Sequence, residues 1–67
     1  MTNTEVYIKY YEDVIKTFEY LLKTLHQKYD NGVISLNYLQ YRETDYLTQI
    51  DITKQRIEYL KTYGLTK

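Results

Sequence analysis

The chain lacks cysteine, proline, tryptophan and alanine, and it has only two glycines among its 67 residues. The absence of cysteine excludes disulfides and thiolate metal sites, and a single histidine is too few for an ordinary zinc site. A chain this small buries only a modest fraction of its surface, so self-association or docking on a partner is the remaining source of extra stability. Without proline, little in the sequence interrupts a helix.

Charge surplus and long apolar runs are also missing. Nine Lys and Arg balance nine Asp and Glu, which argues against nucleic acid as the default partner, because phosphate binding needs a basic surplus. The N-terminus has neither the basic start nor the apolar run of a signal peptide, and no stretch approaches the ~20 apolar residues of a membrane span. We therefore expect residues 1–67 to form a single cytoplasmic domain that does not enter a membrane.

The first half of the chain has the spacing of an amphipathic helix. Thr2 and Glu5 occupy the N-cap and third positions of a capping box. Three glutamates, at positions 5, 12 and 19, each precede a lysine by four residues, which is the favourable order for ion pairs along a helix. We predict a helix over residues 3–31. Its apolar stripe advances in steps of three and four, as in a heptad repeat, and comprises Ile8, Tyr11, Ile15, Phe18, Leu22, Leu25 and Tyr29.

A turn and a second helix follow. Gly32 can take the left-handed conformation of a helix C-cap, and Ser35 is a good N-cap. We predict a helix over residues 36–63, ended by Gly64, with Leu65 folding back on Leu60. The predicted stripe is Leu36, Leu39, Glu43, Tyr46, Ile50, Thr53, Ile57 and Leu60, broadened by Leu47. Because so short a connection favours helices that lie back alongside each other, the expected fold is all-α, an antiparallel two-helix hairpin in which Phe18 faces Tyr46 and Leu47.

Residues 28–47, KYDNGVISLNYLQYRETDYL, resemble part of a known family. They are similar to a segment of outer-membrane efflux channel proteins, in which a Tyr-x-x-Gly turn leads into a long helix that often contains a Leu-Gln pair, as Leu39-Gln40 does here. The resemblance covers under a third of a chain much shorter than the several hundred residues of that family. It implies a helix–turn–helix and carries no transport function across.

The apolar surface is larger than one helix–helix seam requires. On the first helix a second column, Tyr7, Val14 and Leu21, widens the stripe, and we expect it to serve self-association into a homodimeric four-helix bundle. The second helix carries another stripe, predicted to face away from the core and to contact a partner protein. Its candidate contact residues are Tyr38, Tyr41, Thr48, Ile52 and Tyr59. The ten tyrosines fit either an AT-rich coding sequence or selection for interface contacts.

Residues suited to catalysis are scarce. His26 is expected at the edge of the first helix near the turn, where it approaches either Leu39 or Glu43, and a His–Glu contact would form a pH-sensitive lock. Glu43 occupies a stripe position, so we expect it at the rim of the seam, or neutralised by Arg42 or Arg56. No phosphate loop, nucleophile elbow or acidic metal cluster is present in the sequence. We predict a protein that is not an enzyme and needs no cofactor or metal.

These observations favour a small regulator or inhibitor that binds another protein through a tyrosine-rich helical face. Short, charge-balanced chains of this kind are common among phage and mobile-element proteins. Two alternatives remain open at this point. One is a dimeric helical hairpin that binds RNA or DNA through its lysine and arginine columns, and the other is a structural coiled-coil spacer.

Overall fold

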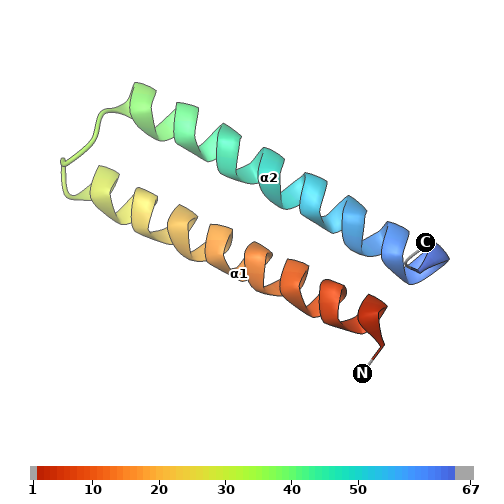
Figure 1. The fold of residues 1–67 in the computed structure, drawn as a ribbon. Helices are drawn as coiled ribbons and strands as arrows, with labels where there is room; N and C mark the ends of the chain where they lie inside the picture. Colours follow the sequence, from red (N-terminus) through yellow and green to blue (C-terminus); the bar gives the residue numbers. More distant parts are fainter. Residues whose placement is uncertain (1, 65–67) are drawn as a thin grey trace.

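The computed structural model describes residues 2–64, which form two helices, α1 (Asn3–Asp30) and α2 (Leu36–Tyr63). The helices lie side by side and run in opposite directions, so the two ends of the described chain meet at one end of the molecule and the turn lies at the other (Figure 1). The hairpin measures 48 × 18 × 14 Å. The predicted antiparallel hairpin is confirmed, and the predicted helix bounds agree to within one residue at each end.

The capping residues define where each helix begins and ends. The Glu5 amide donates to Thr2 Oγ1 (3.1 Å) and the Thr2 amide to Glu5 Oε1 (3.4 Å), which completes the predicted capping box. At the other end of α1, Gly32 has φ 73° and its amide donates to the Tyr29 carbonyl, while the Val33 amide donates to the Lys28 carbonyl. This pair of bonds is a Schellman motif, which returns the chain toward α2.

α2 is capped as its sequence predicts. Ser35 Oγ accepts from the Tyr38 amide at 3.2 Å, which makes it the N-cap. Gly64, at φ 70°, donates its amide to the Leu60 carbonyl at 2.8 Å and ends the helix. Leu65, expected to fold back on Leu60, lies outside the described residues.

The core is a single seam between the two stripes. Phe18 and Tyr46 meet across it with ring centroids 5.8 Å apart, as predicted. Thr53 is buried at a stripe position, where its hydroxyl donates to the Gln49 carbonyl at 2.7 Å, so its polar group is satisfied. The most deeply buried apolar residues are Leu25, Leu39, Ile50, Ile57 and Leu60. One of these five residues, Leu25, belongs to α1 and the other four belong to α2, so α2 is the more completely covered helix.

Several sequence expectations are wrong. The predicted stripe residues next to the turn, Leu36 and Tyr29, are 50 % and 37 % exposed. Leu47, expected to broaden the core stripe and to face Phe18, is 51 % exposed, because its position one step beyond Tyr46 rotates it onto the flank. The glutamate–lysine pairs expected along α1 are also not formed. Within residues 2–64 the one ion-pair contact shorter than 4 Å joins His26 to Glu43. The acidic column of α1 therefore faces water and not its own lysines.

Candidate functional site

The seam has two flanks, and they differ in chemistry. On each helix, one flank is formed by a column of residues that are seven positions apart. Each residue of the column comes immediately before a residue of the core stripe. On α1 these are Tyr7, Val14, Leu21 and Lys28, and on α2 they are Arg42, Gln49 and Arg56. Because α2 runs opposite to α1, these two columns meet on the same side of the hairpin. We call this surface, together with Tyr38 and Tyr59 of α2 that border its hollows, the tyrosine groove.

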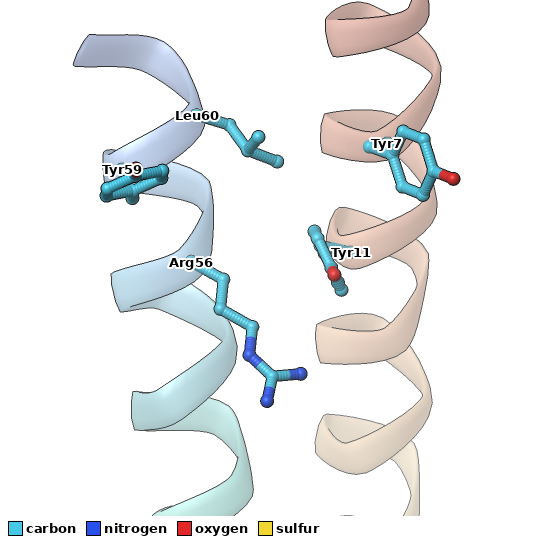
Figure 2. A pocket seen from close by; sticks show the side chains of 5 residues that line it. All are labelled: Tyr7, Tyr11, Arg56, Tyr59 and Leu60. Carbon is cyan, nitrogen blue, oxygen red and sulfur yellow. The ribbon is translucent and has the colours of Figure 1, made fainter. Parts of the chain in front are cut away.

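At the open end of the hairpin the tyrosine groove widens into a hollow of about 440 Å³. Figure 2 shows Leu60 and Arg56 reaching from α2 into the gap toward Tyr11 of α1, while the Tyr7 ring lies over α1 with its hydroxyl directed away from the gap. The Tyr59 ring completes the lining on the α2 side and stacks on Tyr63 at 4.9 Å between centroids. The walls are therefore aromatic and aliphatic, and the one charged group is a guanidinium.

A second hollow, of about 180 Å³, lies at the turn end of the same groove. Leu21 and Lys28 border it from α1, and Tyr38 and Tyr46 border it from α2. Tyr7 and Leu21 belong to one heptad column of α1. Tyr38 and Arg56 are five full helical turns apart on α2, so they point in the same direction. Both hollows thus open on the same side of the molecule.

The two arginines of the groove are held differently. Arg42 donates from Nε to the Tyr38 hydroxyl at 3.2 Å, and its guanidinium carbon lies 5.6 Å from the centre of the Tyr38 ring. The hydrogen bond to Tyr38 raises the pKa of the Arg42 guanidinium above its usual value, so this group stays cationic. Arg56 makes no hydrogen bond or ion pair with any residue between 2 and 64, and its donors are available.

The opposite flank has the character of an ordinary solvated surface. α1 presents Glu5, Glu12, Glu19 and His26 there, and α2 presents Gln40, Leu47, Lys54 and Lys61. Because the helices are antiparallel, Glu5 and Glu12 of α1 are placed opposite Lys61 and Lys54 of α2, so charges of opposite sign face each other. A hollow of about 320 Å³ on this side is lined by Glu12, Ile15, Lys16 and Glu19. Of the charged groups on this flank between residues 2 and 64, His26 and Glu43 are the pair that comes within 4 Å.

His26 and Glu43 meet on this charged flank. His26 Nε2 lies 2.5 Å from Glu43 Oε2, and their side chains are 51 % and 36 % exposed. The expectation that Glu43 lies at the rim is confirmed, and the side chain that contacts it is His26. The alternative partners Arg42 and Arg56 lie on the other flank, where Arg42 bonds Tyr38. The pair joins α1 to α2 near the turn.

The structure divides the surface residues predicted from the sequence differently from the prediction. Tyr7 and Leu21 line the groove hollows, and Val14 lies between them in the same column. Tyr38 and Tyr59, expected on the opposite face, line the same hollows. Tyr41 and Thr48 lie on the outer side of α2, nine residues, or two and a half turns, from buried Ile50 and Leu39 respectively. Ile52 is exposed and lines neither groove hollow.

The sequence pattern missed the contribution of Arg42 and Arg56 to this surface. The signal was available, because Arg42, Gln49 and Arg56 repeat at heptad intervals next to the stripe, as Tyr7, Val14 and Leu21 do on α1. The pattern of each helix alone does not show that the two columns share a groove, because this depends on how the helices pair.

Other kinds of site find no support in the described part of the chain. Between residues 2 and 64, no three acidic or histidine side chains come close enough together to hold a metal ion. Neither α1 nor α2 combines the length and the apolar character needed to cross a membrane.

The chain was compared with family models, with curated proteins and with solved structures, and none of the three comparisons finds a match. Functional inference therefore rests on the groove itself.

Proposed function

We propose that the protein is a small, non-enzymatic regulator or inhibitor that acts by binding another protein along the tyrosine groove. The observation that carries this proposal is the uncovered apolar groove, in which Tyr7, Tyr38 and Tyr59 are all exposed while bordering hollows between the helices. Tyrosine gives large, rigid contact area with a polar tip, which suits a surface that is wet when free and buried when bound.

The exposed area of the chain supports the same proposal. It is 5354 Å², whereas a compact monomer of 8.2 kDa is expected to expose about 4500 Å². The difference, on the order of 800 Å², is similar to what one partner contributes to a standard protein–protein interface. A lone hairpin thus leaves uncovered about as much surface as one such interface hides.

Capture of partners from an extract of the native host tests the proposal. The groove variant carries Tyr7→Ser and Tyr38→Ser. The matched control carries Tyr20→Ser and Tyr41→Ser, which remove two exposed tyrosines from the outer sides of the same two helices. Bound proteins are identified by mass spectrometry, and circular dichroism checks that both variants are helical.

We expect a protein that is captured by the wild type and the control variant and lost with the groove variant. Loss with the control variant alone would place binding on the outer sides of the helices, at Tyr20 of α1 or Tyr41 of α2. Equal capture by all three forms would remove the tyrosine groove as the binding surface.

A further inference from the structure

The tyrosine groove has a geometry that specifies what fits it. On both rims the side chains repeat every seven residues, Tyr7, Val14 and Leu21 on α1 and Arg42, Gln49 and Arg56 on α2. A third helix that packs at a small angle to α1 and α2 meets side chains at this interval along its whole length. An extended peptide, whose side chains alternate with a period of two, does not keep this register.

The length of the groove also suits a helix. Its two hollows lie near Tyr7 at the open end and near Leu21 at the turn end, two heptads apart. That interval is about 21 Å along a helix axis, so a segment of roughly four turns spans both hollows. Large apolar side chains of such a segment, one heptad or two apart, would enter the hollows.

The charges along the groove indicate which charge one flank of a bound helix should carry. The charged residues of the two rim columns are Lys28, Arg42 and Arg56. The Asp45 carboxylate, in the column of Tyr38 and Tyr59, is the least of the influences on the pKa of Arg42. Arg56 has unused donors beside the aromatic walls of its hollow, and Arg42 engages only its Nε with Tyr38. The planar guanidinium of arginine can donate two parallel hydrogen bonds to a carboxylate, so the two groups match in geometry as well as in charge.

We infer that the groove receives an amphipathic α-helix of a partner protein, with carboxylates along one flank spaced two heptads apart to meet Arg42 and Arg56. The inference rests on the proposed function and adds the chemistry of the partner. A second copy of this chain, the homodimer that the sequence led us to expect, fits less well, because it would bring the same cations to the groove. Nucleic acid also fits less well, because the two arginines lie about 21 Å apart with the uncharged Gln49 between them in their column, whereas phosphates follow each other every ~3.4 Å along a strand.

Two synthetic peptides serve as probes. Each has 21 residues with leucine at the a and d positions of three heptads. One carries glutamate at the e and g positions and the other carries lysine there. Binding is measured by the fluorescence anisotropy of labelled peptide. The groove variant is Arg42→Glu with Arg56→Glu, and the control variant is Lys54→Glu with Lys61→Glu, which changes the net charge equally on the opposite flank.

We expect the wild type and the control variant to bind the glutamate peptide about tenfold more tightly than the lysine peptide, and the groove variant to reverse that preference. An unchanged preference in the groove variant would overturn the inference. The inference would also be overturned if a 20-nucleotide single-stranded RNA bound the wild type more tightly than the glutamate peptide does and lost this binding with the arginine substitutions.

Failure of this inference is distinguishable from failure of the proposed function. If the glutamate peptide does not bind but a host protein still depends on Tyr7 and Tyr38 for its capture, the groove is a binding surface of different chemistry. If instead the glutamate peptide displaces a second copy of the chain, so that a dimer in sedimentation becomes a one-to-one complex, the groove prefers the acidic helix, as inferred. A dimer that resists the peptide contradicts the inference.

Discussion

At the scale of single residues, burial separates leucines that the heptad pattern treats alike. Leu25 is 6 % exposed, whereas Leu47 is 51 % exposed although it lies beside a stripe residue. The difference comes from rotation about the helix axis, since one residue step turns a side chain by about 100°. Neighbours of a stripe residue therefore occupy either the seam or a flank, and the two flanks have different roles here.

Replacing each of these leucines by alanine gives the first prediction. Leu25→Ala should lower the free energy of unfolding by about 2–5 kcal/mol, because it leaves a cavity in the seam. Leu47→Ala should change it by less than about 0.5 kcal/mol. Urea denaturation followed by circular dichroism measures both, and a hairpin too weak to survive Leu25→Ala will show loss of helix in buffer. Equal effects of the two substitutions would mean that the seam is not where the structure places it.

The His26–Glu43 contact gives the second prediction. Both side chains are partly exposed, so water screens the interaction and the coupling should be only about 0.2–1 kcal/mol. A double-mutant cycle with His26→Gln, Glu43→Gln and the combination isolates this term from other effects of each change. Thermal or urea unfolding at a fixed pH provides the measurement. A coupling indistinguishable from zero would show that the two side chains do not pair in solution.

At the scale of elements, the helix ends are determined by local chemistry that can be read directly from the sequence. The capping box, the N-cap serine and the two glycines lie at the ends of α1 and α2. Each of these motifs depends on residues within a few positions of one another, so no knowledge of the fold is needed to recognise them. The short turn then leaves the antiparallel hairpin as the favoured arrangement.

Gly32 gives the third prediction, which belongs to the turn. A Cβ built at Gly32 meets no atom within 4 Å, so an added side chain costs only the left-handed backbone conformation at φ 73°. Gly32→Ala should therefore destabilise the hairpin by about 1–2 kcal/mol. Gly32→Asn should cost less, because asparagine adopts this conformation more readily. Chemical denaturation of the two variants tests this order, and an equal loss would indicate that the cost arises from something other than the backbone.

The arrangement of the flanks could not be read from either helix alone. The heptad pattern gives the angular position of Tyr38 on α2 and of Leu21 on α1, but their common groove depends on how the two helices pair. Tyr59 was predicted on the face away from the core, yet it borders the hollow at the open end. The partner of Glu43 was equally undetermined, because shifting the register by half a turn exchanges the residues that face it.

At the scale of the whole molecule, the zero net charge conceals an unequal distribution. The tyrosine groove carries Lys28, Arg42 and Arg56, while the charged flank holds the acidic column of α1. Two copies that meet through the groove bring cations together, whereas a partner with carboxylates brings opposite charges together. Salt screens both interactions, with a Debye length of about 10 Å at 0.1 M. Added salt should therefore strengthen self-association through the groove and weaken the binding of acidic partners.

This opposition gives the fourth prediction. In sedimentation velocity at micromolar concentration and about 0.05 M NaCl, the wild type should have a mass near 8.2 kDa, and any dimer fraction should rise as NaCl increases toward about 1 M. The variant with Arg42→Gln and Arg56→Gln lacks most of the repulsion, so its dimer fraction should be higher at low salt and change less with NaCl. Arg56 and Arg42 lie about 21 Å apart along α2, which limits repulsion within one chain and makes the effect intermolecular. A wild-type dimer that is complete at low salt and dissociates as NaCl rises would show that opposite charges hold the two copies together, and it would identify the charged flank, with its glutamates and lysines, as the dimer interface.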